Sequence, residues 1–315
     1  MTEETKSPSD LAKLPRQRAS EAADSGADNG AEPAVKVVRE WQEVWHRYAA
    51  NKLALVGLVL VAGLLLTAAF APLIAPYDPL LQNLDRTIEA PSAAHWFGTD
   101  ILGRDQLSRV IYGARIATIV GIVSILLTLV IGIVLGAVAG YFGRFYDTLT
   151  MRAADVFFAF PLLIGAIIII TVIGRGVWPV VLSLAIFGWA TVARLLRSSV
   201  LSVREMDYVH AARALGAGHL RVIVRHILPN SLAPVLIYGT FNVGTAVVAE
   251  ASLSYLGVGV SPEIPEWGNM LAAGKGFIGV YDYMWTLPSV AVVLTTLGFI
   301  FVGDGLRDAL DPKLR

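Results

Sequence analysis

The sequence predicts an all-α polytopic membrane protein with six transmembrane helices. Of its 315 residues, 55% are hydrophobic and 16% are charged, whereas a soluble domain carries about 25% charged residues. Six apolar segments are each long enough to cross a hydrocarbon core about 30 Å thick, which takes roughly 20 helical residues. Because backbone polar groups in hydrocarbon must be paired within the protein, these segments are expected to be helices.

The third predicted span is the shortest of the six, and it contains Pro161. We place this proline near the cytoplasmic end of the span, where the loss of one helical hydrogen bond is least disruptive. The six spans are expected near Leu53–Ile74, Ile116–Gly140, Val156–Ile173, Val177–Leu196, Leu232–Leu256 and Leu287–Gly303.

The residues before the first span divide into two parts. Residues 1–35 have almost no bulky apolar side chain, so they are expected to form a disordered cytoplasmic tail. Residues 36–52 alternate aromatic and charged residues at helical spacing, which is typical of an amphipathic helix at the membrane interface. A plain helical extension of the first span remains an equal alternative. The membrane domain then covers residues 53–315.

The orientation follows from the distribution of Lys and Arg. Most of them flank the spans on the side that carries both termini and the segment between spans four and five. The positive-inside rule makes that side cytoplasmic. Two long loops, 77–110 and 257–286, lie on the other side. Aromatic residues of the second loop fit an interfacial belt or contact a docked partner or solute, and the sequence leaves both interpretations open.

Residues 203–230, between spans four and five, form the one long basic and amphipathic interruption of the apolar sequence. Apolar residues recur at helical spacing in two groups, and Gly216 and Gly218 separate them. Glycine adopts positive φ without steric cost and commonly ends a helix, and Pro229 is expected to stop the second helix. We therefore predict two short helices with uncovered apolar faces, the first along Tyr208, Ala211, Ala212 and Leu215 and the second along Leu220, Ile223, Val224 and Ile227.

Motifs for catalysis, nucleotide binding and metal binding are missing from the sequence. It contains no G-x-x-x-x-G-K-[ST], no H-E-x-x-H and no G-x-S-x-G, so we expect no catalytic residue, no metal site and no cofactor bound by this chain. His210, His219 and His226 lie close in sequence but lack a carboxylate or thiol at a completing spacing. With no cysteine, disulfides are excluded.

Glu250 is the one carboxylate predicted to lie well inside a span. An ionisable residue at bilayer depth is a functional candidate because its exposure to lipid is costly. Glu250 is therefore a possible pathway residue, and a satisfied structural contact near the outer end of the span is the alternative. On the second span, Gly132, Gly136 and Gly140 recur every four residues, a spacing that lets a neighbouring helix approach closely.

The segment Tyr208-Val209-His210-Ala211-Ala212-Arg213-Ala214-Leu215-Gly216, followed by Ile227-Leu228-Pro229-Asn230, resembles the "EAA" loop of bacterial ATP-binding-cassette (ABC) importer permeases. His210 stands where that loop usually has glutamate. The segment from His95 to Arg115, the segment Leu253–Gly259 and the segment Gly303–Pro312 resemble the C-type permease of dipeptide and oligopeptide importers. Together these stretches extend the resemblance to nearly all of the chain after residue 35.

The resemblance implies the type I fold of importer permeases, with a coupling-helix pair in the 203–230 loop, and a multi-pass location in the bacterial cell membrane. It implies four kinds of partner: a homologous B-type permease, two ATPase subunits that bind ATP and Mg, an extracytoplasmic peptide-binding protein, and the lipid bilayer. Nucleic acid is not expected. The residues implied to contact the ATPase are Tyr208, His210, Ala211, Ala212, Arg213, Ala214, Leu215, Gly216 and Ala217.

Two alternatives remain open. The same machine can import nickel or another small solute, since importers of those solutes share this permease type. A stand-alone secondary transporter is the other, but such proteins usually show inverted repeats with broken helices, and no convincing internal repeat is visible in the sequence.

Overall fold

Helices make up nearly all of the regular structure. The computed structural model describes residues 40–310, with side chains from Val44 onward, so the predicted tail of residues 1–35 lies outside the described part. Residues 44–310 form one compact unit, to which the following statements refer. The α-helices are α2 (Glu40–Ala50), α3 (Lys52–Ile74), α4 (Gln106–Phe142), α5 (Arg144–Phe158), α6 (Leu162–Ile173), α7 (Val177–Val203), α8 (Asp207–Ala214), α9 (His219–Val222), α10 (Leu228–Ser231), α11 (Ala233–Tyr255), α12 (Trp267–Gly274) and α13 (Tyr283–Leu310), with 3₁₀ turns η1 (Leu84–Arg86) and η3 (Lys275–Phe277) and a π-helical segment η2 (Ile223–Ile227).

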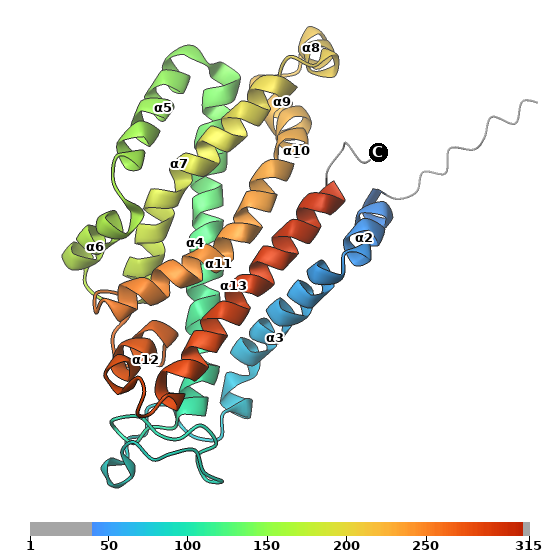
Figure 1. Ribbon diagram of the computed structural model, residues 1–315. Helices are drawn as coiled ribbons and strands as arrows, with labels where there is room; N and C mark the ends of the chain where they lie inside the picture. The colour runs from blue at the N-terminus through green and yellow to red at the C-terminus, as the bar shows by residue number, and fades with distance from the viewer. Residues whose placement is uncertain (1–39, 311–315) are drawn as a thin grey trace, which may run out of the picture. The chain divides into compact units, whose positions relative to one another are not determined.

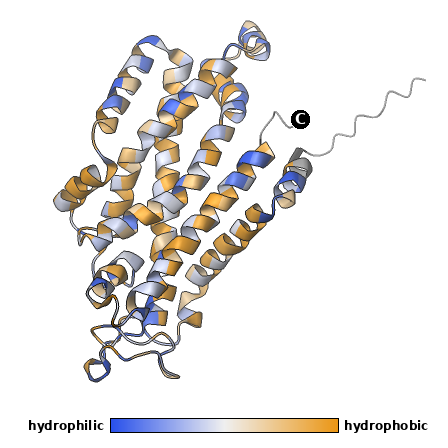
Figure 2. Ribbon diagram, in the orientation of Figure 1, coloured by the Kyte–Doolittle hydropathy of each residue, from blue (hydrophilic) through white to orange (hydrophobic). Residues whose placement is uncertain are grey.

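Five helices are long and apolar enough to cross a membrane: α3, α4, α7, α11 and α13. They confirm the first, second, fourth, fifth and sixth predicted spans, and Figure 2 shows that their residues are predominantly hydrophobic. In Figure 1, α8 and the C-terminal end of α13 lie at one end of this bundle, and the loop between α3 and α4 lies at the opposite end. We call these the α8 end and the loop end.

The third predicted span, Val156–Ile173, is not one continuous helix. It is broken between α5 and α6, whose axes differ by 89°, and Pro161 lies at this break rather than within a helix. The break is next to the middle of α7, because the Phe157 ring lies 5.3 Å from the Trp189 ring and 5.6 Å from that of Phe187. α6 has 12 residues, about 18 Å of helix, so only the bent pair together can serve as a sixth span.

The most extensive helix contact joins α4 and α7 through the predicted glycine row. A Cβ atom placed on Gly132, Gly136 or Gly140 would lie 2.4 Å, 2.6 Å or 2.8 Å from the nearest atom of α7. Real Cβ atoms do not come so near, so the two backbones approach at distances that only glycine permits. The glycine row is therefore an internal packing face of this chain.

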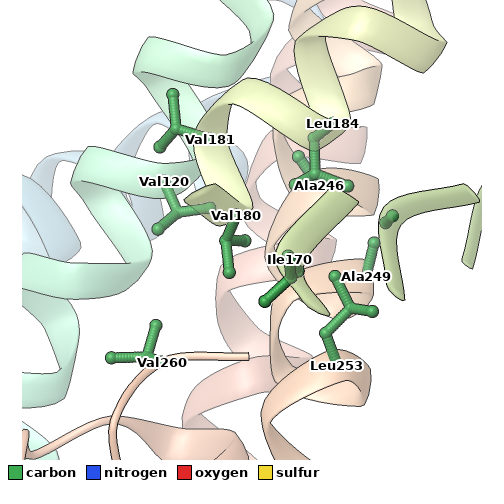
Figure 3. Packing of buried hydrophobic residues seen from close by; sticks show 10 residues of the cluster. Val120, Ile170, Val180, Val181, Leu184, Ala246, Ala249, Leu253 and Val260 are labelled. Atoms are coloured by element: carbon green, nitrogen blue, oxygen red, sulfur yellow. The ribbon is translucent and has the colours of Figure 1, made fainter. Parts of the chain in front are cut away.

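Around this pair the other helices pack in order: α11 against α4 and α13, and α3 against α13 and α4. Figure 3 shows where α4, α6, α7 and α11 meet in a cluster of small and β-branched side chains. Its fully buried members include Val120, Ile170, Val180 and Leu253. Much of the surface of α3 by contrast remains exposed and apolar, as expected for a face covered by lipid.

The predicted interfacial segment is partly present as α2. Asn51 separates α2 from α3, because its side chain accepts hydrogen bonds from Leu53 N and Ala54 N and so begins a new helix. α2 is thus a helix of its own, and its location at a membrane interface stays a prediction. Tyr48 anchors it by donating a hydrogen bond to Ala54 O, 3.1 Å away.

Replacement of Gly136 by valine is expected to destabilise the protein by about 1–3 kcal/mol or more, because overpacking at this site forces the two backbones apart. Gly63→Val is the matched control, since Gly63 is also a helical glycine but has no atom within 4 Å of a Cβ position. Thermal unfolding of the purified protein in detergent measures both. Equal melting temperatures for the two variants would contradict the close-packing argument.

Candidate functional site

The segment predicted to contact an ATPase forms a short helix at the α8 end. α8 runs from Asp207 to Ala214, which confirms the first predicted helix of the pair. Its one buried side chain is Val209, which has no exposed surface and joins a core cluster with Val200 and Val222. The predicted apolar row lies on the other side of the helix, and its residues Tyr208, Ala211 and Leu215 are exposed.

Gly216 ends α8 as predicted. Its φ of +82° is in the left-handed region, and no atom lies within 4 Å of its Cβ position, so backbone conformation alone favours glycine here. Ala217 N donates to Ala212 O and Gly216 N to Arg213 O, the hydrogen bonds of a Schellman-type helix end. Gly218 has a φ of −66° and precedes the next helix.

The second helix of the predicted pair does not stop at Pro229. It runs through α9, η2 and α10, and Pro229 lies in the first turn of α10. Pro229 has no N–H to donate to a helical hydrogen bond. In the π-helical segment η2 before it, each backbone hydrogen bond spans five residues instead of four, so Leu228 N donates to Ile223 O. Ile223 and Ile227 are buried in the bundle, whereas Leu220 and Val224 remain exposed, so the predicted apolar row is divided between two environments.

Tyr141, at the end of α4, ties this helix pair to the spans. Its hydroxyl lies 2.9 Å from His219 Nδ1, and the Arg213 guanidinium stacks 5.1 Å above its ring. Arg204, which follows α7, donates to Gly140 O over 2.8 Å. The pair is therefore fixed to the ends of both α4 and α7. Tyr141 could not be predicted as an anchor, because its partners lie more than 70 positions away in the sequence and no periodic pattern links them.

Several apolar side chains of the two helices are exposed at the α8 end. Leu215 is 89% exposed and Leu220 is 75% exposed. His210 is also exposed, and its Nε2 lies 3.8 Å from a carboxylate oxygen of Glu205. Contact of these side chains with another protein stays a prediction. We call the exposed residues Tyr208, Leu215, Leu220 and Val224 the coupling surface.

At the loop end, polar side chains of the segment 95–109 bond one another. Asp105 caps α4 by accepting hydrogen bonds from Ser108 N and Ser108 Oγ, and His95 Nδ1 lies 2.9 Å from its other oxygen. Asp100 accepts a 2.7 Å hydrogen bond from Arg104 Nε, and Arg109 Nη1 donates to Pro79 O. These residues form a folded cap over the start of α4.

Glu250 lies buried between α11 and α12. Ser254 Oγ donates to Glu250 Oε1 over 3.2 Å, and the carboxyl group of Glu266 is a close neighbour of the Glu250 carboxyl. Glu266 also caps α12 by accepting from Gly268 N and Asn269 N. Burial raises the pKa of the Glu266 carboxyl, which lies outside the spans, and the two backbone hydrogen bonds oppose that shift. The pathway role of Glu250 stays a prediction.

No group of three or more His, Cys, Asp or Glu side chains within residues 44–310 is arranged to hold a metal ion. His210, His219 and His226 in particular do not form one, since His219 instead contacts Tyr141.

Residues 132–315, more than half of the chain, match the family model described as "binding-protein-dependent transport system inner membrane component", and residues 40–91 match that of the "N-terminal TM domain of oligopeptide transport permease C". The chain belongs to the binding-protein-dependent transport permease family. Members of this family are transport components of the inner membrane. Similarity to named permeases extends over nearly their whole length, and both the loop-end cap and the coupling surface lie within the similar part.

Named relatives are similar over most of the chain. The dipeptide transport system permease protein DppC of Alkalihalophilus pseudofirmus is 41% identical over 278 residues, which covers 88% of this chain and 91% of the relative. The oligopeptide transport system permease protein OppC of Bacillus subtilis is 39% identical and covers 94% and 97%. The glutathione transport system permease protein GsiD of Pectobacterium atrosepticum is 40% identical and covers 87% and 92%.

A solved structure with a similar fold is the MetNI methionine ABC transporter in an inward-facing conformation. The match has a TM-score of 0.53 and 21% identity, and it covers 64% of this chain and 97% of that one. At this identity the likeness concerns the fold alone, and it shows that the bundle has the architecture of an ABC importer permease.

Replacement of Glu250 by leucine is expected to destabilise the protein by about 1–3 kcal/mol, because the Ser254 hydroxyl loses its buried acceptor. Glu250→Gln is the matched control, since the amide oxygen still accepts from Ser254. Thermal unfolding in detergent distinguishes them. If glutamine lowers the melting temperature as much as leucine does, the hydrogen bond from Ser254 does not explain why a glutamate is buried here.

Proposed function

We propose that this chain is the C-type permease subunit of an ATP-driven importer that carries dipeptides and oligopeptides across a bacterial cell membrane. The observation that carries the proposal is the coupling surface: apolar side chains that no described residue covers, on helices fixed to the ends of α4 and α7. The family membership and the names of the permeases to which the chain is similar support it.

The proposed partners follow from this surface and from the family. Two ATPase subunits bind ATP and Mg, and one of them covers the coupling surface. A homologous B-type permease forms the membrane pathway together with this chain, and an extracytoplasmic binding protein delivers the peptide. The chain itself binds no cofactor and breaks no bond.

Closure of the ATPase dimer would move α8 and, through its anchors, the spans. Val209 packs with Val200, which precedes it on α7, and with Val222, which follows it on α9. The Tyr141 hydroxyl is hydrogen bonded to His219 Nδ1. A displacement of α8 therefore acts on α4 and α7 as one body, since their backbones are in contact at the glycine row. Arg213 stacks on Tyr141, so its proposed pairing with acidic groups of the ATPase would extend the same contact.

The proposed orientation places the α8 end in the cytoplasm. Arg204, Arg213, Arg221 and Arg225 lie in or beside the helices of this end, and basic residues favour the cytoplasmic side. The C-terminal end of α13 lies at this end (Figure 1), in keeping with cytoplasmic termini. The binding protein would then dock on the loop end.

Two alternatives differ in what they require. Import of nickel or another small solute needs the same machine and a different delivery protein. A stand-alone secondary transporter needs no ATPase, so purification from the native membrane separates the two classes by whether ATPase subunits copurify.

Leu215→Asp is expected to weaken ATPase copurification and abolish peptide-stimulated ATP hydrolysis, because a buried carboxylate in an apolar contact costs several kcal/mol. Leu84→Asp is the matched control for ATPase copurification: Leu84 is 69% exposed but lies at the loop end, away from the proposed ATPase contact. Copurification of the subunits and ATPase activity in reconstituted membranes measure both variants. Normal coupling in Leu215→Asp would exclude this surface as the contact.

A further inference from the structure

A cavity of about 250 Å³ lies inside the bundle between the α5–α6 break, α7 and α11. We call its neutral polar lining residues, which come from three helices, the polar wall, and its aromatic lining residues the aromatic wall. Among the residues that line it, none has a formal charge. The polar wall consists of Thr128, Thr191, Tyr238, Asn242 and Thr245.

The polar wall has unused hydrogen-bonding capacity. Thr128 is 2% exposed, and its hydroxyl has no partner within the described part of the chain. Asn242 donates one amide hydrogen to Tyr238 O, which leaves its Oδ1 available as an acceptor. Buried polar groups are normally hydrogen bonded, so an unpartnered one at a cavity indicates a missing ligand or water.

The position of this wall is unfavourable for contact with lipid. Thr245 is exposed on α11, and α11 is the least hydropathic of the five long spans. On α3, by contrast, the exposed residues of the span are predominantly apolar. Polar side chains at membrane depth usually face a protein interface or a water-filled space.

The broken span gives a second, independent indication. The α5–α6 break lies at the level of Phe187 and Trp189 in the middle of α7, and Phe158, Phe160 and Leu162 around it line the cavity. Non-helical backbone at membrane depth is tolerated only where protein buries it or where it lines a water-filled cavity.

We propose that this cavity is a peptide-backbone binding site on the translocation pathway. Thr128, Asn242 and Thr245 hydrogen bond to the amide groups of the passing peptide, and the aromatic wall contacts its side chains. The inference rests on the proposed function and adds the residues that hold the substrate. With no charged residue in the lining, this wall accepts peptides of differing charge.

The size of the cavity fits a shared site. It falls below the roughly 300–1,000 Å³ of a pocket for a drug-sized ligand, so this chain encloses only part of a peptide. Phe158 and Phe160 are about half exposed, at 48% and 52%. The B-type permease, which would pack beside them, completes the enclosure.

The main experiment introduces opposite charges at one position of the lining. Thr245→Asp and Thr245→Lys are each reconstituted with the full set of subunits and the binding protein in proteoliposomes. Uptake of a lysine-containing and a glutamate-containing tripeptide is compared at saturating binding protein. Thr245→Asp is expected to favour the lysine peptide and Thr245→Lys the glutamate peptide, by about fivefold each, the effect of one charge pair in a hydrated site.

A second pair of variants needs no charge in the membrane. Thr128→Val removes the unpartnered hydroxyl with little change of shape and is expected to change peptide uptake per ATP hydrolysed by about two- to tenfold. Ser124→Ala is the matched control, because Ser124 is also buried and unpartnered on α4 but does not line the cavity, so its uptake is expected to remain unchanged.

The outcomes separate the two proposals. If the wild-type complex imports no peptide, the proposed function fails and the site fails with it. If the wild type imports peptide but the two Thr245 variants show the same selectivity, the site is wrong and the function stands. If those variants do not assemble, equal uptake by Thr128→Val and Ser124→Ala overturns the site, and lipid or the partner permease fills the cavity.

Discussion

The close approach of α4 and α7 is the contact on which the rest of the bundle depends. In a bilayer, apolar side chains gain little by leaving lipid for protein, so helices associate through van der Waals contact and a few polar bonds. The glycine row brings the two backbones together over about two helical turns. α4 also carries the loop-end cap at Asp105 and the anchor Tyr141 at its other end, so one helix pair positions both functional ends.

Charged groups lie mainly at the two ends of the bundle, and neutral polar groups lie between them. Ion pairs such as Arg204–Glu205 lie near the α8 end, and Asp100–Arg104 lies at the loop end. Between them the structure places neutral hydroxyl and amide groups, and the deeply buried Glu250 accepts a hydrogen bond from the Ser254 hydroxyl. A charged substrate-binding group at mid-depth would carry a large desolvation penalty, whereas neutral groups satisfy a peptide backbone at little cost.

Hydropathy and periodicity predicted most of the fold, because span length is set by bilayer thickness and helix rise. They did not predict the break at Pro161, which depends on Phe157 packing against Phe187 and Trp189 far along the chain. Helical spacing found the apolar row of Tyr208 and Leu215, yet it gave no sign that Val209 would be the residue buried against the bundle. A pattern in one segment identifies a face, but only tertiary contacts decide what covers it.

The path from the coupling surface to the proposed peptide site is one nearly unbroken helix. α9, η2, α10 and α11 follow one another with right-handed helical backbone at Ile223, Leu228 and Leu232, and the π segment accommodates Pro229 without ending the helix. In the proposed importer, movement of α9 by the ATPase would therefore be transmitted along this rod to Asn242 and Thr245 without a flexible loop between them. The α5–α6 break lines the same cavity, and Phe157 beside it packs against Phe187 and Trp189 of α7. In the proposed importer, a movement of α11 relative to α7 and this break would change the width of the cavity in each transport cycle.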